Sequence, residues 1–424
     1  MLSPSFSTSN NRSYFVSWIV CLCAGLFFCY ELMQFHLLNA ISSVLMQDLK
    51  ISGSHLGLLG STYLLADVIF LIPAGILLDR LSTKKVILTA LGICICGTVG
   101  FAVSTTFYQA CISHFLSGIG NAFCFLSCVI LVSRWFPKEK QGFVVGVIVT
   151  LGMLGGVLAQ APFNYLAQVC TWRAAMMIDA GIGVLLLLAI AFCVKDAPTA
   201  LVFSKKPWLS ASFFQELTTC LISKQNLLCG SYTALTNLPL MIIGATWGSL
   251  FLSQKHGWTL AESSWIAGMI CMGTIVGSSL FGYLSDRFHH RKKFMLFGAF
   301  TSCVFMLLIM HVQEISLGHM SCLFFLLGLL TSTQVLGYPL ITEKAPPHLV
   351  GTSMSVAAVI IMGLAGVMQY VSGILIDWKW NGLILNGSPV YTDQDFHRCF
   401  MIFPIGLILA ILSVPFIQEK KQGE

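Results

Sequence analysis

Three acidic residues interrupt long apolar stretches of this chain: Glu31, Asp67 and Asp179. An ionisable side chain in a membrane-spanning helix is costly and usually serves a function. A carboxyl group held away from water favours its protonated form. Each of these residues could therefore carry a proton, or bind an ammonium group when it is charged. The alternative for each is a structural hydrogen bond to a neighbouring helix.

Glu31 lies in the run Tyr30-Glu31-Leu-Met-Gln34-Phe-His36, a little past the middle of the first apolar stretch. Residues 30 and 34, and residues 31 and 34, share a helical face. The spacing predicts one polar stripe directed into a central cavity, with Glu31 as the principal proton-carrying or ammonium-binding group. His36 titrates near neutral pH and could also carry a proton.

The other two acids differ in their expected roles. Asp67 is predicted near the middle of its helix, with His114 as the only basic residue at a similar depth. Proton relay and structural bonding are both open for Asp67, and His114 could likewise titrate. Asp179 is predicted near the outer end of its helix, where pairing with Arg173 would make it structural.

The elements that position these residues follow from composition. The chain has 424 residues, of which 56% are hydrophobic and 9% charged, whereas soluble domains carry roughly 25% charged residues. We therefore predict an all-α integral membrane protein with twelve transmembrane helices. They are placed at 14–40, 55–78, 86–104, 108–133, 141–168, 173–194, 227–252, 263–285, 294–312, 317–342, 351–376 and 398–417.

A polar loop recurs in the second half of the chain. The first copy contains Gly75, Asp79, Arg80 and Lys84, and the second, 207 residues later, contains Gly282, Asp286 and Arg287. Duplicated halves of this kind indicate a secondary transporter. We expect two pseudo-symmetric six-helix bundles. The predicted parts are a tail at 1–13, a bundle at 14–194, a linker at 195–226, a bundle at 227–417 and a tail at 418–424.

The positive charges predict the orientation. Of the 23 Lys and Arg residues, 18 fall on the side that carries both termini, which places the termini in the cytoplasm. The net charge of +6 thus reflects topology and not a nucleic-acid partner. We find no Walker sequence, no nucleophile–base pair and no metal-ligand spacing. We therefore expect neither an enzyme nor a metal or cofactor, with a proton as the coupling ion.

These features resemble the Major Facilitator Superfamily over essentially the whole chain. The first loop matches the signature G-x-L-x-D-R-x-G-R-K-x, with Ser82 and Thr83 replacing a glycine and a basic residue. The run His114-Phe-Leu-Ser-Gly118-Ile-Gly120 is similar to the motif R-x-x-x-G-x-G, with histidine in place of arginine. Tyr30-Glu31 and Gly351-Thr-Ser-Met resemble one branch: bacterial phagosomal importers of amino acids and nucleosides, and lysosomal dipeptide transporters.

The resemblance implies that two bundles rock around a site at the membrane midplane and that the two loops act as gating latches. Asp79 would bind an arginine of its own loop and the N-terminus of a facing helix, which Gly75 would let approach. The first, fourth, seventh and tenth helices would line the pathway. Candidate cavity residues are Asn121, Gln160, Asn237, Trp247, Gln334, Tyr338, Gln369 and Tyr370. Pro239 and Pro339 should interrupt the seventh and tenth helices.

The predicted substrate is a small polar organic solute. No Lys or Arg lies deep in a predicted helix, so the site suits neutral, zwitterionic or cationic molecules. Our hypothesis is proton-coupled uptake of an amino acid, dipeptide or similar nutrient by a monomer in a bacterial inner membrane. The alternatives are a proton-driven exporter of a drug or siderophore-like compound, and a uniporter of the same nutrients. A non-transporting receptor on this fold is a further class.

Overall fold

The computed structural model describes residues 9–198, 211–346, 349–385 and 387–419. Within these ranges, twelve helices are long and apolar enough to cross a membrane. The predicted fold class is therefore confirmed. The first six spans are α1 (Ser9–Leu49), α2 (Gly53–Arg80), α3 (Thr83–Ala102), α4 (Phe107–Trp135), α5 (Lys138–Leu158) continued by α6 (Ala161–Cys170), and α7 (Trp172–Cys193).

The second six spans contain more interruptions. The seventh span consists of α9 (Lys224–Leu238), the π-helical segment η1 (Pro239–Trp247) and α10 (Gly248–His256), and the eighth and ninth are α11 (Leu260–Phe288) and α12 (Arg291–His311). The tenth span consists of α13 (Leu317–Thr331), the 3₁₀ segment η2 (Ser332–Leu336) and α14 (Gly337–Lys344). The eleventh is α15 (Val350–Asp377), and the twelfth consists of α16 (Asp393–Phe400), α17 (Ile402–Ser413) and η3 (Val414–Phe416). A helix α8 (Ala211–Leu221) lies in the predicted linker, and β1 (Ile384–Leu385) pairs with β2 (Ser388–Pro389) as a hairpin.

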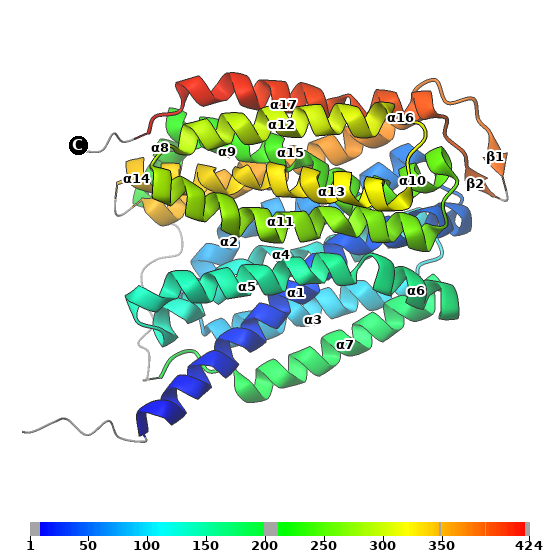
Figure 1. Ribbon diagram of the computed structural model, residues 1–424. Helices are drawn as coiled ribbons and strands as arrows, with labels where there is room; N and C mark the ends of the chain where they lie inside the picture. Colours follow the sequence, from blue (N-terminus) through cyan, green and yellow to red (C-terminus); the bar gives the residue numbers. More distant parts are fainter. Residues whose placement is uncertain (1–8, 199–210, 347–348, 386, 420–424) are drawn as a thin grey trace, which may run out of the picture.

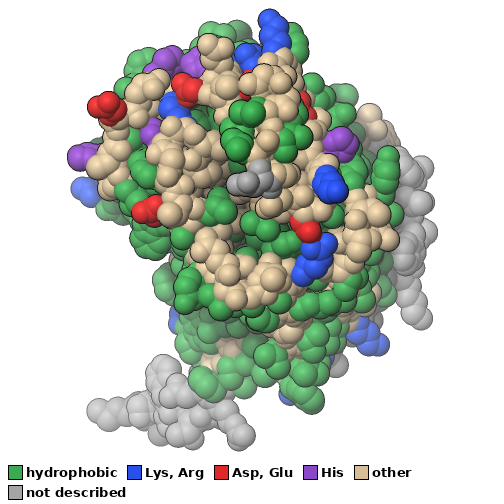
Figure 2. Space-filling view, turned by 90° about the vertical axis from the view of Figure 1, so that its right-hand side faces the viewer, with side chains coloured by type: hydrophobic (Ala, Val, Ile, Leu, Met, Phe, Trp, Pro, Cys, Tyr) green, Lys and Arg blue, Asp and Glu red, His purple; other side chains and the backbone are tan. Residues whose placement is uncertain are grey.

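Figure 1 shows the helices in two groups, with α1 to α7 below and α9 to α17 above. Helix α1 begins, and α17 ends, at the left of the view; we call this the terminus end. The hairpin, α6 and α10 lie at the right, which we call the hairpin end. Figure 2 looks onto the hairpin end, where charged and polar side chains gather over its upper part.

Most span boundaries fall close to the predicted ones, and the first span is the main difference. It runs to Leu49, past the predicted end at residue 40. Hydropathy falls there because of Asn39 and Ser42, but both side chains are buried and bonded inside the protein. A polar residue with internal partners does not end a helix.

The two irregular segments lie at the predicted proline interruptions. The π segment η1 begins at Pro239. In the tenth span the 3₁₀ segment η2 precedes Pro339 and ends with Val335 and Leu336. Proline has no N–H for the carbonyl one turn before it, so the backbone rearranges upstream of Pro339. Such segments interrupt helices at functional sites.

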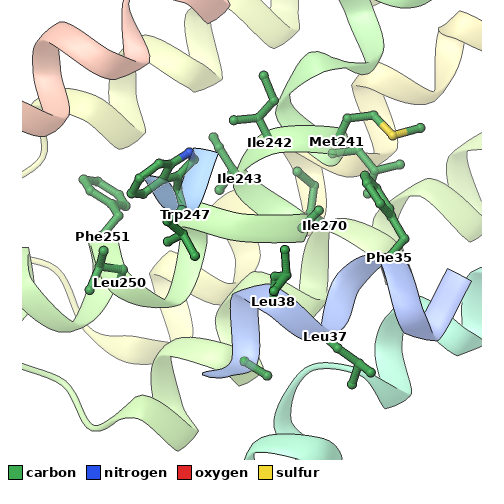
Figure 3. Packing of buried hydrophobic residues seen from close by; sticks show 14 of the residues in the cluster. Phe35, Leu37, Leu38, Met241, Ile242, Ile243, Trp247, Leu250, Phe251 and Ile270 are labelled. Carbon is green, nitrogen blue, oxygen red and sulfur yellow. The ribbon is translucent and has the colours of Figure 1, made fainter. Parts of the chain in front are cut away.

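The two groups of helices pack tightly against each other in the half of the molecule nearer the hairpin end. Phe35 and Leu38 of α1 belong to one buried cluster with Met241 and Ile243 of η1 and Ile270 of α11. Figure 3 shows Leu38 pointing toward Ile270 and Phe35 toward Met241. The boundary between the halves is therefore apolar around the polar residues described below.

Candidate functional site

Glu31 points into the first group of helices. Its side chain is fully buried. The hydroxyl of Tyr63 on α2 lies 3.2 Å from Glu31 Oε2 and donates to the Glu31 carbonyl at 2.9 Å. On the other side is Gly120 of α4, where an added Cβ would lie 2.0 Å from Glu31 Oε1. The carboxyl group is thus held between α2 and α4, in a space that exists because residue 120 has no side chain.

Tyr30 and Gln34 form the rest of the predicted stripe, and both reach α7. Gln34 Nε2 donates to the carboxylate of Asp179, and the Tyr30 hydroxyl donates to the Asp179 carbonyl at 3.3 Å. Thr98 of α3 donates to Gln34 Oε1 at 3.3 Å. The stripe therefore exists, but its direction was predicted wrongly: these residues face α3 and α7 inside the first group. The reason is that buried partners satisfy their polar atoms there.

Asp179 also differs from its prediction. It is 1% exposed and bonded to Gln34, instead of pairing with Arg173 near the membrane surface. Arg173 forms its ion pair with Asp48 at the end of α1, where both groups keep contact with water. The sequence placed Asp179 too close to the surface because its buried partner, Gln34, is 145 residues away in the chain.

Asp67 and His114 lie nearby without forming a pair in the described contacts. Asp67 is 1% exposed, and neither of its carboxyl oxygens has a hydrogen-bond partner in the described structure. The His114 ring lies between the rings of Tyr63 and Phe101, with centroids 5.2 and 5.6 Å away. His114 also lines a cavity of about 10 Å³ together with Gln34. That volume is close to the least that holds one water molecule.

Glu31, Asp67 and Asp179, which we call the acid cluster, form no ion pair with a described Lys or Arg. The ion pairs formed by the described residues lie near helix ends, and none involves the acid cluster. Three uncompensated negative charges in one low-dielectric bundle would be very unfavourable. The three carboxyl groups of the cluster are therefore suited to gaining and losing protons.

His36 lies at the boundary between the two groups of helices. Its ring faces two glycines: a Cβ on Gly156 of α5 would lie 3.3 Å from Nδ1, and one on Gly244 of η1 would lie 3.8 Å from Cδ2. Nδ1 is 2.8 Å from the Leu32 carbonyl. The buried Nε2 has no hydrogen-bond partner in the structure. This nitrogen can bind a polar group that enters between the halves.

A polar bridge crosses the boundary one turn beyond His36. Asn39 Nδ2 donates to Gln160 Oε1 at 2.6 Å, and Gln160 Nε2 donates to the Gly244 carbonyl at 2.6 Å. Asn39 Oδ1 accepts from the backbone N–H of Ser249 at 2.9 Å. We call Asn39, Gln160, Gly244 and Ser249 the polar bridge. It joins α1 and the turn between α5 and α6 of the first group to η1 and α10 of the second.

The comparisons with known proteins identify the family of this chain. A family model described as the Major Facilitator Superfamily matches residues 23–375. The chain belongs to this superfamily. It is therefore an integral, multi-pass membrane protein.

Its superfamily relatives are diverse. The sialic acid transporter NanX of Escherichia coli is 23% identical over 299 residues, or 70% of this chain and 69% of that protein. The probable galactarate/D-glucarate transporter GudP of the same species is 21% identical over 89% of this chain and 87% of its own length. The probable sulfoacetate transporter SauU of Cupriavidus necator is 23% identical, but the match spans only 61% of its length.

Two solved superfamily structures share the fold. A bacterial homologue of the human lysosomal transporter Spinster, inward-facing and unoccupied, has a TM-score of 0.77 at 16% identity, covering 96% of this chain and 99% of that one. A D-xylose–proton symporter has a TM-score of 0.75 at 16% identity, covering 96% and 98%. At this identity the likeness establishes the fold alone.

The cavity residues predicted from the superfamily fold separate into two sets. Gln160 belongs to the polar bridge, and Asn121, Gln334 and Tyr338 are partly exposed. Asn237 is 6% exposed with an unpaired Oδ1. By contrast, Trp247 Nε1 donates to Ser372 at 2.8 Å and Gln369 donates to Thr246, both within the second half. Tyr370 is 41% exposed and makes no described polar contact with either set.

The described contacts of Gly75 and Lys84 in the first signature loop, and of Asp286 and Arg287 in the second, lie within their own halves. Gly75 has Leu126 of α4 as its nearest neighbour, at 3.8 Å from a built Cβ, and no facing helix approaches. Lys84 N donates to Asp196 at 2.8 Å. The side chain of Asp79 lies outside the described part, and Arg80 has an interaction of its own.

The second loop is likewise bound within its half. Arg291 pairs with Asp286 at 3.1 Å and with Glu343. Arg287 donates to the hydroxyl of Tyr283 at 3.0 Å, and Gly282 has open space around it. The expected close approach of another helix at Gly75 is thus absent here, because the halves meet at the opposite end.

Sequence reasoning missed several functional residues. Asn39 lies three residues after His36 within an apolar run, a signal that could have extended the polar stripe. Ser249 follows Trp247 without any pattern that marks it. Tyr63 was overlooked as a partner of Glu31 because an aromatic residue in an apolar helix is ordinarily a packing residue.

Proposed function

We propose that this chain is a proton-coupled secondary transporter that takes up a small neutral or zwitterionic polar solute, such as an amino acid or dipeptide, by alternating access. The observation that carries the proposal is the acid cluster: three buried carboxyl groups within one bundle that form no ion pair with a described Lys or Arg. Proton uptake and release is the chemistry that such a cluster suits best.

The acid cluster is connected to the boundary between the halves through α1. Glu31 faces α2 and α4, while His36, about one and a half turns later, faces α5 and η1. A change in the packing around Glu31 on protonation can therefore shift the helix that presents His36 and Asn39 to the second half. This supports coupling of proton movement to opening and closing between the halves.

The substrate class follows from the groups at the boundary. His36, Asn39 and Gln160 supply an imidazole nitrogen and amide groups, which hydrogen-bond polar solutes. No described Lys or Arg lies beside them, so a permanently anionic solute would lack a charge partner. An amino acid, dipeptide or similar nutrient meets these conditions, which also agrees with the importer branch that Tyr30-Glu31 resembles.

A carboxylated solute is the second candidate. The named relatives include transporters of sialic acid, galactarate or D-glucarate, and sulfoacetate. Protons taken up by the acid cluster would then offset the charge of the solute. The uniporter alternative has no observation of this kind in its favour.

The orientation is proposed from the charge distribution. Most Lys and Arg residues lie at the terminus end, which we assign to the cytoplasm, and the hairpin end then faces outward. In the described structure the halves meet near the hairpin end, and we propose that this contact closes the outer side. A bacterial inner membrane and a monomeric carrier remain our proposals.

Uptake into proteoliposomes tests the proposal. Radiolabelled pools of amino acids, dipeptides, nucleosides, sugars and sugar acids would be offered with and without an inward proton gradient. Gradient-driven accumulation of a zwitterionic or neutral pool supports the proposal. Accumulation of the sugar acids alone selects the second candidate, and equilibration that ignores the gradient indicates a uniporter. No uptake of any pool contradicts the importer and directs the test to efflux from loaded vesicles.

A further inference from the structure

The N-terminus of α2 lacks a cap from its own segment. The first four N–H groups of a helix have no partner within the helix. The side chain of Ser52, which precedes Gly53, bonds none of them. Its hydroxyl instead lies 3.0 Å from both Ser54 Oγ and His55 Nδ1. The first turn of α2 also contains no acidic residue.

The missing cap comes from the other half of the protein. Asp377, the last residue of α15, accepts from the N–H of Gly53 at 3.1 Å and from the N–H of Ser54 at 2.7 Å. It also accepts from the Ser54 hydroxyl at 2.6 Å. Each carboxylate oxygen therefore takes one backbone N–H of α2. A carboxylate in this position is also favoured by the helix dipole.

Tyr391 completes the contact from the segment after the hairpin. Its hydroxyl accepts from the N–H of Gly53 at 2.8 Å and donates to Asp377 at 2.8 Å. Tyr391 is 3% exposed. Burial and the charge of Asp377 raise the pKa of Tyr391, so its hydroxyl keeps the proton that it donates.

The backbones of α2 and α15 touch at the same place. A Cβ on Gly373 would lie 2.5 Å from the Gly53 carbonyl oxygen, and one on Gly57 would lie 2.7 Å from the Gln369 carbonyl oxygen. Glycines allow helices to approach this closely in membranes. Separation of the halves at this end would remove the glycine contact and both partners of the α2 N-terminus together.

We infer that Asp377 and Tyr391 form a latch that holds the hairpin end closed by capping α2 across the two halves. The inference rests on the alternating-access part of the proposed function, but not on the solute or the proton. When the hairpin end opens, the N–H groups of Gly53 and Ser54 lose their acceptors. The free energy lost with this helix cap therefore determines how often the hairpin end opens. Helix α2 itself remains anchored in the first half.

Distances across the hairpin end test the latch. Spin labels would be attached through unnatural amino acids at two exposed positions, Tyr108 in the first half and His319 in the second, and measured by double electron–electron resonance. Neither solute nor a proton gradient is present, so the result is independent of the transport assay. We expect Asp377→Asn, which removes the negative charge and one of the two acceptor oxygens, to raise the ratio of long to short distances about fivefold, the equilibrium effect of a typical cap.

Three further variants decide the outcome. Asp393→Asn is the matched control, because Asp393 lies at the same end of the molecule and its negative charge pairs with Lys255 inside the second half. It should leave the distances unchanged, and Asp377→Glu should restore the short distance. If Asp377→Asn does not fold, Tyr391→Phe is measured instead and should shift the ratio in the same direction. Distances in these latch variants that equal those of the wild type and Asp393→Asn overturn the inference.

Discussion

Gly120 of α4 lies directly against Glu31 of α1, and a Cβ at position 120 would be 2.0 Å from Glu31 Oε1. Real Cβ atoms do not approach an oxygen so closely, and the buried carboxyl group has little room to move. The glycine and the acid are therefore one structural unit. The second glycine of the motif that begins at His114 makes the space in which the acid is buried.

Substitution of Gly120 should displace Glu31 without changing it chemically. We expect Gly120→Ala to lower the free energy of unfolding by about 1–3 kcal/mol, the usual cost of overpacking, and to reduce gradient-driven uptake at least tenfold. Thermal unfolding in detergent and proteoliposome uptake measure the two effects. Gly146→Ala, where nothing lies within 4 Å of the added Cβ, is the control. Normal uptake by Gly120→Ala would show that the position of Glu31 is unimportant.

His36 should contribute to solute binding more than to proton coupling, because its unpaired Nε2 faces the boundary between the halves. We expect His36→Ala to raise the KM for uptake about tenfold, the effect of losing one hydrogen bond of about 1.4 kcal/mol. The dependence of uptake on the proton gradient should remain. His319→Ala, at an exposed site, should behave as wild type. A loss of gradient dependence with unchanged KM would instead assign His36 to proton transfer.

Asp179 offers a way to separate structure from proton chemistry. Gln34 donates to its carboxylate, and an asparagine could accept the same bond. We expect Asp179→Asn to keep gradient-driven uptake within about threefold of wild type. Asp179→Ala should cost about 1–3 kcal/mol of stability, since it leaves Gln34 without an acceptor. If both variants fold but neither accumulates solute against a gradient, then the Asp179 proton itself takes part in coupling.

Gln160 is the central residue of the polar bridge, and its removal should loosen the hairpin-end closure. Gln160→Ala leaves Asn39 Nδ2 and the Gly244 carbonyl without their partner. We expect the spin-label ratio across the hairpin end to shift toward long distances by roughly threefold to tenfold. Gln168→Ala is the control, because the described hydrogen bond of this side chain is to Asn164 within α6. An unchanged ratio in Gln160→Ala would mean that the apolar packing of Phe35 and Leu38 alone closes this end.

Sequence reasoning succeeded where the signal is local. Apolar runs of about 20 residues gave the twelve spans, since length and hydropathy depend only on neighbouring residues. The rarity of charge within those runs identified Glu31 and Asp67 as buried, whereas Asp179, also buried, was predicted near the membrane surface. The direction in which each side chain points could not be predicted from local sequence. Period alone places Tyr30, Glu31 and Gln34 on one face, but it does not say which helix that face meets.

The partners that decide the site are far apart in the chain. Gln34 and Asp179 are separated by 145 residues, and Asp377 caps a residue 324 positions earlier. Asp377 also sits at a helix end, where an acidic residue ordinarily reports only the membrane surface. Because charged residues are common at water-facing helix ends, the sequence did not indicate that Asp377 contacts the other half. The contact is visible only in the tertiary structure.

Solute-driven proton movement tests the central claim most directly. Proteoliposomes containing a pH-sensitive dye would receive the transported solute in the absence of any imposed gradient, with wild type and Glu31→Gln measured side by side. Glu262→Gln, an exposed acid in the capping box of α11, is the control. Our account predicts acidification of the lumen by wild type and Glu262→Gln. It also predicts that Glu31→Gln exchanges labelled solute without proton entry. Proton entry with the solute in Glu31→Gln at the wild-type rate would contradict the account.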